Sequence, residues 1–405
     1  MTRDDRLRVL VLSRSYPSDV LPHLGLWVER PTQLLDSCCD VRVVAATPWC
    51  PPLPDVGPLR QYVRFRRIPR RETRAGIAVE RPRFLTGPGT TLYAFDAASQ
   101  ALALRRMVDR IRSEFPFDLI HAHMIYPEGA VAHRLARRYG VPFVVTEHAP
   151  WTDVWFRSGR VRSDALAAGR AAASLLAVST SVRDTIVAHG VDPDRIDVVP
   201  IGVDPDRFAL GPADARRPDQ VLFVGWPNFT KGLDVLLLAM ALLAERGSAA
   251  RLLVAGGALY RHTRIQEEKL RRLAVNLGLQ ERVTFLGARP HEEVARLMRE
   301  SAVLVLPSRA ESFGAVLIEA LASGTPVVAT RCGGPEDVVT EDVGVLVPRE
   351  DPLALAEAIE SILAQPGRYS PTELRRYAVS RFGLERVVGR VCDRYRALVE
   401  NQASP

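Results

Sequence analysis

The hydrophobic residues of this chain are concentrated in short continuous runs, and the stretches between the runs place apolar residues every three to four positions. Continuous apolar runs predict β-strands that are buried on both faces, because a strand with one solvated face would alternate apolar and polar residues. The stretches between them, such as "GLDVLLLAMALLAERG" and "HEEVARLMRES", predict amphipathic helices. The predicted strands lie at 8–13, 41–46, 118–123, 142–148, 174–179, 196–200, 220–225, 251–257, 282–287, 302–308, 325–330 and 344–348.

This alternation predicts an α/β fold with parallel sheets covered by helices. Twelve strands exceed what one open sheet commonly holds, so we expect two doubly wound, Rossmann-like domains that face a central cleft. The stretch 200–220, rich in Pro, Gly and Asp, looks like a linker, and we predict domains over 1–203 and 204–383. Ligands of such sheets bind beyond the carboxyl ends of the strands, so functional residues should directly follow the apolar runs.

The net charge of +7 permits an anionic ligand, a nucleic acid or an acidic membrane surface as a partner. The first residues, "MTRDDRLRVLVLSRSYP", include acids and only a short apolar run, so they predict a first strand rather than a signal peptide. No stretch reaches the ~18 uninterrupted apolar residues that a membrane-spanning helix needs. We therefore expect a cytoplasmic protein.

The cysteines and the two "DPD" triplets do not indicate a metal site. The five cysteines are odd in number and lack the spacing of a metal site, so we predict reduced thiols in a cytoplasmic protein. The triplets, at 192–194 and 204–206, lie in proline-containing loops, where turn formation and helix capping explain them. The cysteines are Cys38, Cys39, Cys50, Cys332 and Cys392.

Two carboxylates flank the start of a predicted helix in "ESFGAVLIE", residues 311–319. Glu311 follows a strand, and Glu319 lies roughly 12 Å further along if each helical residue adds about 1.5 Å. This is wider than the ~5–9.5 Å of two carboxylates that act on one bond. The helix start between them favours phosphate, so the stretch suits a nucleotide sugar with hydroxyls at both ends. The alternative is a solvated Glu319 and a capping Glu311.

Lys231 and three histidines also follow predicted strands. Lys231 opens a helix after "FVGWPNFT", where its charge opposes the helix dipole unless a phosphate is bound; the alternative is a solvated lysine. His121, His123 and His148 lack a fourth ligand with metal-site spacing. We interpret His148 as a hydrogen-bonding group that faces substrate, and the alternative for each histidine is a structural role.

Two N-terminal segments bear on the ligand class. "SRSYPSDVLPHLGLWVERP" contains Gly25 but no G-x-G-x-x-G motif, which counts against a dinucleotide-binding dehydrogenase. Residues 60–84 interleave arginines with Tyr62, Phe65 and Phe84. We interpret this segment as a surface for anionic lipid or a polyanionic acceptor, rather than for nucleic acid. The alternative is a solvated excursion of the chain.

Taken together, these motifs resemble the family 4 glycosyltransferases of the GT-B fold. "PSRAESFGAVLIEALASGTPVVAT" resembles the E-x7-E segment of that family, and "VGWPNFTKGLDVLL", "VVPIGVDPDRF" and "GGPEDVVTEDVGVLVP" match in order and spacing. "DLIHAHMIYPEGAVAHRLARRYGVPFVVTEH" and "SYPSDVLPHLGLWVERPTQLL" are similar to members that build surface polysaccharides. The match covers most of the chain.

The resemblance implies a role for each candidate residue. Glu311 would bind the donor sugar, Glu319 the ribose hydroxyls, and Lys231 the leaving diphosphate. His148 would face the donor sugar at the reaction centre, and Gly25 would approach the diphosphate from the N-terminal domain. Catalysis would depend on His148, Lys231 and Glu311. The further donor-binding residues, which offer backbone rather than side-chain contacts, are Gly225, Phe313, Gly314, Ala315 and Val316.

The implied reaction retains the anomeric configuration and needs neither metal nor cofactor, with a nucleotide-diphosphate sugar as co-substrate. The acceptor would be a saccharide, a lipid-linked sugar or a small molecule, in polysaccharide, glycolipid or other glycoconjugate biosynthesis at the inner membrane face. The 384–405 helix would pack back on the N-terminal domain.

Trp226 stands where many members have an arginine that is paired with the lysine. One cation for the diphosphate is therefore missing, unless Arg289 or Arg309 substitutes for it. The alternatives are a nucleotide-sugar epimerase and a non-catalytic binding protein.

Overall fold

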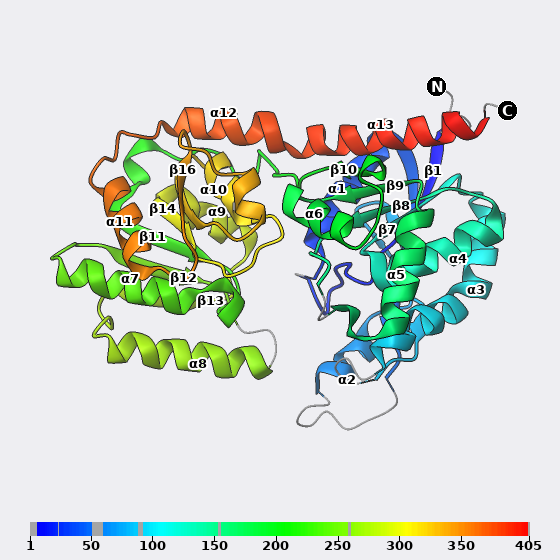
Figure 1. Ribbon diagram of the computed structural model, residues 1–405, viewed down its shortest axis with the longest axis horizontal. Coiled ribbons are helices and arrows are strands. Elements are labelled where there is room, and N and C mark those ends of the chain that lie inside the picture. The colour runs from blue at the N-terminus through cyan, green and yellow to red at the C-terminus, as the bar shows by residue number, and fades with distance from the viewer. Residues whose placement is uncertain are drawn as a thin grey trace. The chain divides into compact units, whose positions relative to one another are not determined.

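The computed structural model describes residues 6–22, 24–50, 60–87, 92–152, 155–257 and 261–403. The chain divides into two compact units, which are described separately (Figure 1). Unit 1 comprises Met1–Pro200 and Val387–Pro405, and unit 2 comprises Ile201–Arg386.

Among the described residues, unit 1 contains an eight-stranded sheet with the order β10-β9-β8-β7-β1-β2-β5-β4. Every pairing is parallel except that of β4 with β5. The strands are β1 (Leu7–Leu12), β2 (Cys39–Val44), β4 (Arg71–Arg74), β5 (Ile77–Glu80), β7 (Leu119–His123), β8 (Phe143–Glu147), β9 (Ser174–Ala177) and β10 (Ile196–Val198), with β3 (Thr47–Pro48) and β6 (Arg83–Phe84) paired apart. The helices are α1 (Leu26–Leu34), α2 (Arg60–Arg67), α3 (Asp96–Glu114), α4 (Ala130–Tyr139), α5 (Gly159–Ala171) and α6 (Thr180–Ala188).

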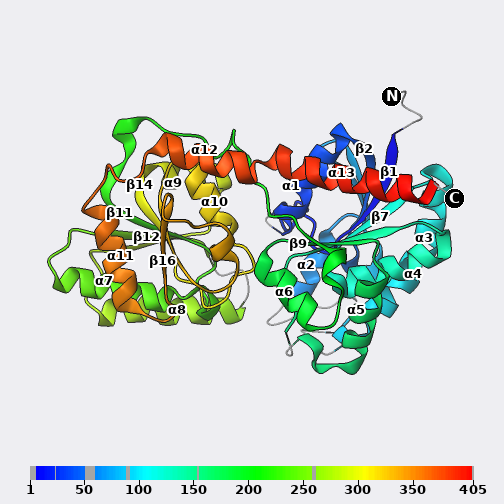
Figure 2. The ribbon, with the colours of Figure 1, turned by 45° about the horizontal axis from the view of Figure 1, so that its top comes forward.

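Unit 2 contains a parallel six-stranded sheet with the order β13-β12-β11-β14-β15-β16. Helices α7, α8 and α11 lie on one face and α9, α10 and α12 on the other (Figure 2). The strands are β11 (Arg217–Val224), β12 (Arg251–Ala255), β13 (Val283–Gly287), β14 (Ser301–Leu306), β15 (Val327–Thr330) and β16 (Gly344–Val347). The helices are α7 (Leu233–Glu245), α8 (Arg261–Asn276), α9 (His291–Glu300), α10 (Ala315–Ala322), α11 (Pro352–Leu363) and α12 (Pro371–Phe382).

The continuous apolar runs do form strands that are buried on both faces. Val303, Leu304 and Val305 of β14 are each 0% exposed, and so are Val9, Leu10 and Val11 of β1. The predicted class, an α/β chain with two doubly wound sheets, is therefore confirmed. The antiparallel pair β4–β5 was not predicted, because its residues, "RETR" and "IAVE", are too short and too charged to stand out as buried strands.

The C-terminal helix α13 (Leu384–Ala403) begins in unit 2 and belongs to unit 1 from Val387 onward. It contacts the β9–β10 end of the unit 1 sheet, since Arg394 pairs with Asp197 at 3.0 Å and Arg390 donates to the carbonyl of Val198 at 2.7 Å (Figures 1 and 2). Cys392 on this helix forms a disulfide with Cys38.

The prediction of five reduced thiols is therefore wrong for one pair. Cys38 and Cys392 are 354 residues apart in the sequence, and they meet only because α13 folds back beside the start of β2. Residue spacing carries no information about such a contact. Cys39, Cys50 and Cys332 are not in a disulfide; the first two are buried, and Cys332 is partly exposed.

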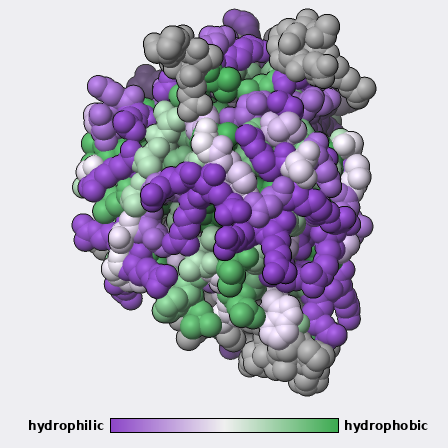
Figure 3. Space-filling model, turned by 90° about the vertical axis from the view of Figure 1, so that its right-hand side faces the viewer, coloured by the Kyte–Doolittle hydropathy of each residue, from purple (hydrophilic) through white to green (hydrophobic). Residues whose placement is uncertain are grey.

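Hydrophilic side chains cover most of the face in Figure 3, with apolar positions scattered between them. Within the described ranges, none of the helices combines the length and apolar character required to cross a bilayer. The same part of the chain holds no cluster of three or more His, Cys, Asp and Glu arranged for a metal ion. Asp192 and Asp204 of the "DPD" triplets accept hydrogen bonds from backbone N–H groups two residues on, as turn formation predicts.

Candidate active site

At the carboxyl edge of unit 2, Lys231 and Glu311 are in direct contact. Lys231 closes the turn after β11, and Glu311 lies in the loop after β14. These loops meet because β11 and β14 are neighbours in the sheet. Lys231 Nζ lies 2.5 Å from Glu311 Oε2, and the Ser308 hydroxyl donates to the same oxygen at 3.3 Å. The two side chains are 27% and 14% exposed, so a ligand can reach the pair.

The Lys231 turn is held in place by backbone geometry. The Asn228 side chain caps the turn by accepting from the Lys231 N–H at 2.9 Å. The next residue, Gly232, has φ of 65°, and a Cβ there would lie 1.9 Å from the Pro307 carbonyl oxygen. Only glycine fits this close approach to the end of β14, which brings Lys231 to Glu311.

The start of α10 lies directly after Glu311. Gly314 precedes the helix with φ of 88°, and Ala315 and Val316 form its first turn, where N–H groups have no acceptor within the helix. The Phe313 ring is 1% exposed and packs edge-on against Phe382. Phe313 therefore belongs to the core through its side chain, and only its backbone can contact a ligand.

Glu319, on the same helix, is not the solvated residue of the alternative interpretation. The residue is only partly exposed. Burial raises the pKa of the carboxyl group, and the charge of Arg207 opposes this in part, so that the pKa is about 8. No described residue donates a hydrogen bond to this carboxyl group. A desolvated carboxyl without protein partners is able to accept hydroxyl groups from a ligand.

Neither arginine proposed as a substitute at Trp226 has an uncommitted charge. Arg309 bonds to both Asp234 oxygens at 2.8 and 2.7 Å and to Glu350 at 3.0 Å. Arg289 pairs with Glu293 at 3.5 Å. Trp226 itself is 45% exposed after Gly225, which follows β11. Lys231 is also paired, but its partner Glu311 is itself a candidate ligand-binding residue. A ligand at this site could therefore replace that pairing, which is not so for the partners of the two arginines.

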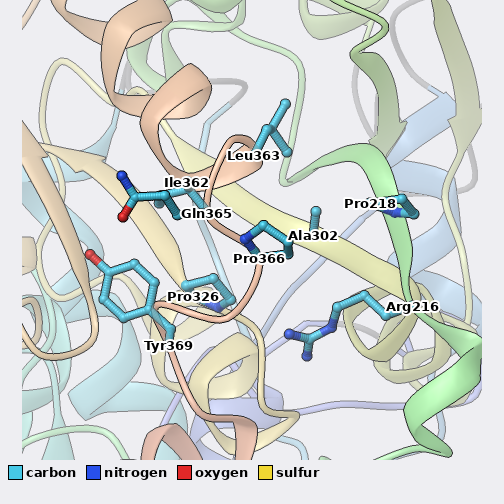
Figure 4. Close-up of a pocket in the computed structure, with 9 residues that line it drawn as sticks. All are labelled: Arg216, Pro218, Ala302, Pro326, Ile362, Leu363, Gln365, Pro366 and Tyr369. Carbon is cyan, nitrogen blue, oxygen red and sulfur yellow. The ribbon is translucent and has the colours of Figure 1, made fainter.

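A cavity of about 250 Å³ lies at the opposite, amino edge of the unit 2 sheet, where β11, β14 and β15 begin (Figure 4). Its one charged side chain, Arg216, donates to the Gly324 carbonyl at 2.5 Å. This cavity is therefore separate from the Lys231–Glu311 pair. The lining residues are Arg216, Pro218, Ala302, Pro326, Ile362, Leu363, Gln365, Pro366 and Tyr369.

At the carboxyl edge of unit 1, the structure brings His148 against His123. His123 Nδ1 lies 3.0 Å from His148 Nε2, while His121 bonds to the Thr146 hydroxyl at 2.8 Å. Burial lowers the pKa of His121 to about 3 and that of His148 to about 4, and the pKa of His123 also falls well below its usual value. All three imidazoles are therefore neutral at pH 7, so each has one nitrogen that donates and one that accepts a hydrogen bond.

Glu147, which sequence reasoning missed, organises the loop that carries His148. Its fully buried carboxylate accepts four N–H groups at 2.9–3.2 Å, and burial raises its pKa to about 7. The signal was an acid at the end of a buried run, directly before His148. The donors are the backbone N–H groups of Ile125, His148 and Ala149 and the indole N–H of Trp151.

Gly25 precedes α1 with φ of 80°, and a Cβ there would lie 1.9 Å from the Ser15 carbonyl oxygen. Close packing against Ser15 by itself requires glycine at this position. The approach of Gly25 to a diphosphate stays a prediction.

In the segment 60–84, ion pairs between described residues engage at least three of the nine arginines. Arg71 pairs with Glu80 at 3.2 Å, Arg74 with Glu29 at 2.8 Å, and Arg81 with Glu72 at 2.5 Å. Tyr62 lies among the residues whose side chains are not described. The exposed arginines of α2 and its following turn include Arg64, Arg66 and Arg70.

Comparison with known proteins identifies both halves of the chain. Residues 212–381 match the family model "Glycosyl transferases group 1", and residues 32–207 match "Glycosyltransferase Family 4". The D-inositol 3-phosphate glycosyltransferase of Xylanimonas cellulosilytica is 36% identical over 70% of this chain and 73% of its own length. That of Frankia alni is 35% identical over 62% of this chain and 66% of its own length.

Solved structures share the fold across nearly the whole chain. Sucrose-phosphate synthase from Thermosynechococcus elongatus superposes with a TM-score of 0.80 at 24% identity, covering 98% of this chain and all of that one. Anabaena Alr3699/HepE, in complex with UDP, has a TM-score of 0.74 at 19% identity, covering 97% of this chain and all of that one. At these identities the likeness concerns the fold.

The raised pKa of Glu319 predicts that removal of its charge stabilises the protein at high pH and has no effect at low pH. The wild type loses stability as pH rises from 4.5 through 8, because only the folded state disfavours the ionised carboxyl. Glu319→Gln removes this penalty, so the ligand-free variant should be more stable than wild type by roughly 2–4 kcal/mol above pH 8, with no difference near pH 4. Urea unfolding at both pH values measures this.

Glu357→Gln, at a residue whose side chain is 61% exposed, is the control and should show no such change. Equal stabilities at pH 9 would contradict the assignment.

Proposed function

The chain is a glycosyltransferase of family 4 with the GT-B fold, and from that premise we propose that it transfers a sugar from a nucleotide-diphosphate sugar with retention of anomeric configuration. The observation that carries the proposal is the contact between Lys231 and Glu311 at the carboxyl edge of unit 2, directly before the start of α10. A cation, a carboxylate and free helix N–H groups are the groups that a sugar diphosphate needs.

The leaving diphosphate is the main charge that the reaction must stabilise. Lys231 and the N–H groups of Ala315 and Val316 would receive it, so these groups act most strongly as the glycosidic bond breaks. Once phosphate oxygens occupy Lys231, Glu311 is released to accept hydroxyl groups of the donor sugar. Glu319 would accept the ribose hydroxyls, which compensates for its desolvation.

We favour attack from the same face of the sugar as the leaving group. The acceptor oxygen forms a bond to the anomeric carbon as the bond to the diphosphate breaks, and the acceptor proton passes to a phosphate oxygen. Glu311 supports this route, because its pairing with Lys231 suits it to sugar binding rather than to covalent attack. Lys231 and the helix N–H groups supply the positive potential, which supports a reaction without a metal ion.

For unit 1, we propose that His148 faces the donor sugar and that the acceptor binds at the same carboxyl edge. The neutral imidazole of His148 suits contact with a hydroxyl group. The relatives are named for a sugar-alcohol phosphate acceptor, and we propose a saccharide, a lipid-linked sugar or a small polyol as the acceptor class. A thermal-shift screen of UDP-, GDP-, ADP- and dTDP-sugars identifies the donor, because a ligand of the folded state raises its stability.

The stereochemistry and metal independence can be tested in one experiment. With the donor from the screen and an acceptor, proton NMR recorded during turnover should show the product first in the anomeric configuration of the donor, at the same rate with and without EDTA. An inverted product would refute the front-face route, and loss of the rate with EDTA would refute metal independence. Conversion of the donor alone, without acceptor, would instead indicate the epimerase alternative.

Lys231 and Glu311 should each be essential for transfer. Lys231→Ala and Glu311→Ala should lower kcat/KM by at least about a hundredfold, since a charge stabiliser of the leaving group or a sugar-binding carboxylate is lost. The chain has only two lysines, so Lys269→Ala on α8 is a matched control that should keep full activity. Circular dichroism confirms that each variant is folded. Activity within threefold of wild type in both site variants would refute the assignment.

We also propose peripheral contact between the segment 60–84 and an anionic membrane. After ion pairing, the arginines that remain exposed are near α2, and each basic residue near such a surface contributes about 1 kcal/mol.

Liposome flotation tests the contact. Binding to vesicles with phosphatidylserine should fall as salt rises from 50 to 500 mM, because the Debye length shortens to a few ångström. Replacing Arg64, Arg66 and Arg70 with Gln should abolish binding, whereas replacing the paired Arg71 should change it little. Equal binding to neutral vesicles would refute an electrostatic contact.

A further inference from the structure

We propose that His123 and Tyr395 are positioning residues for His148, so that the C-terminal helix α13 sets the orientation of the reaction-centre imidazole. The proposal rests on the proposed function, which places His148 against the donor sugar. It extends that function to residues that do not touch the substrate, on β7 and α13.

The first step is the contact between His123 and His148. Both rings are neutral, so the 3.0 Å contact between His123 Nδ1 and His148 Nε2 contains one proton. The two rings are also stacked, with centroids 5.3 Å apart. His148 is thereby held at Nε2, and its other nitrogen, Nδ1, is buried without a hydrogen-bond partner among the residues that the structure describes. An unpaired buried nitrogen costs about 1–3 kcal/mol, which a substrate hydroxyl at Nδ1 would offset.

The second step is the packing of His123 against His121. Alternate residues of a strand share one face, so both β7 histidines lie on the same side of the sheet. Their ring centroids are 4.4 Å apart. His121 is bonded at both nitrogens, to the Thr146 hydroxyl at 2.8 Å and to the Tyr395 hydroxyl at 2.5 Å. Rotation of the His121 ring would break both bonds, so this ring is held in one orientation. It therefore restricts the orientation of the His123 ring that packs against it.

The third step is the anchoring of Tyr395 on α13. Tyr395 is 0% exposed and lies three residues after Cys392, on the same face of the helix. The disulfide from Cys392 to Cys38 ties this turn of α13 to the chain before β2. The Tyr395 hydroxyl is therefore held against His121, and a displacement of this turn would leave His121 Nδ1 unpaired in the core.

Substitutions at Tyr395 and His123 test the positioning roles. Tyr395→Phe should lower kcat about tenfold and His123→Leu about a hundredfold, because small misplacements of a reaction-centre group are costly, while KM for the donor stays within twofold. His123→Asn should restore most of the activity lost in His123→Leu, since its amide can occupy the position of Nδ1. The double variant Tyr395→Phe with His123→Leu should be no worse than His123→Leu alone, because both act through one path.

Tyr139→Phe is the matched control. Its hydroxyl donates to Asp109 at 2.6 Å, at the end of α4 before β8, away from the carboxyl edge. Tyr139→Phe and Tyr395→Phe should lower Tm by similar amounts, but only Tyr395→Phe should lower kcat. If both leave kcat within twofold, or if both lower it equally, the positioning role of Tyr395 is overturned.

Nitrogen-15 NMR of the eight histidines separates this proposal from the proposed function. In the wild type, His148 should show one neutral tautomer, and in Tyr395→Phe or His123→Leu it should show a mixture. An unchanged tautomer in both variants would overturn the inference even in an active enzyme. If the wild type transfers no sugar from any donor, the proposed function fails, and the tautomer measurement still decides whether α13 positions His148.

Discussion

The candidate site of each unit depends on the same constraint, which is that a parallel sheet covered by helices leaves its accessible polar side chains mainly at the strand ends. Apolar residues of central strands such as β1 and β14 are fully buried, and most of the candidate ligand-binding side chains lie where a strand passes into a loop. Lys231, Glu311 and His148 all lie just beyond the carboxyl ends of strands. Adjacent strands then bring together loops that are about 80 residues apart in the sequence, as in the Lys231–Glu311 contact.

The basic residues near the carboxyl edge of unit 2 differ in how firmly their charge is held: an arginine such as Arg309 is bonded in several places, whereas Lys231 has a flexible side chain. Nearly all of the 54 basic residues of the chain are arginines. A lysine has a compact charge on a flexible stem, which makes it easier to transfer from a carboxylate to a phosphate. Lys231 is one of two lysines in the whole chain, and the exposed Trp226 precedes the turn that carries it. The proposed donor site on this edge therefore relies on Lys231 and the helix N–H groups for positive charge.

Unit 1 uses neutral groups where unit 2 uses charged ones. Burial keeps His121, His123 and His148 uncharged, and the carboxylate of Glu147 is satisfied by four N–H groups. A network in which nearly every polar atom is paired is rigid, and His148 Nδ1, which finds no partner in the described part of the chain, is the position proposed for a ligand. The disulfide and Tyr395 make the last helix of the chain part of this network.

The sequence by itself determined the fold class, because continuous apolar runs report strands that are buried on both faces wherever they occur. It also marked Lys231, Glu311 and His148 as candidates, since each is a polar residue that follows such a run, and Glu319 as a carboxylate within the helix that follows one. Only the tertiary structure decided which distant residues meet. The Cys38–Cys392 disulfide, the Tyr395–His121 bond and the role of Glu147 depend on contacts between elements up to 354 residues apart. Hydrophobic periodicity reports whether one segment is buried. It carries no information about which atom of a distant segment a buried polar atom bonds to.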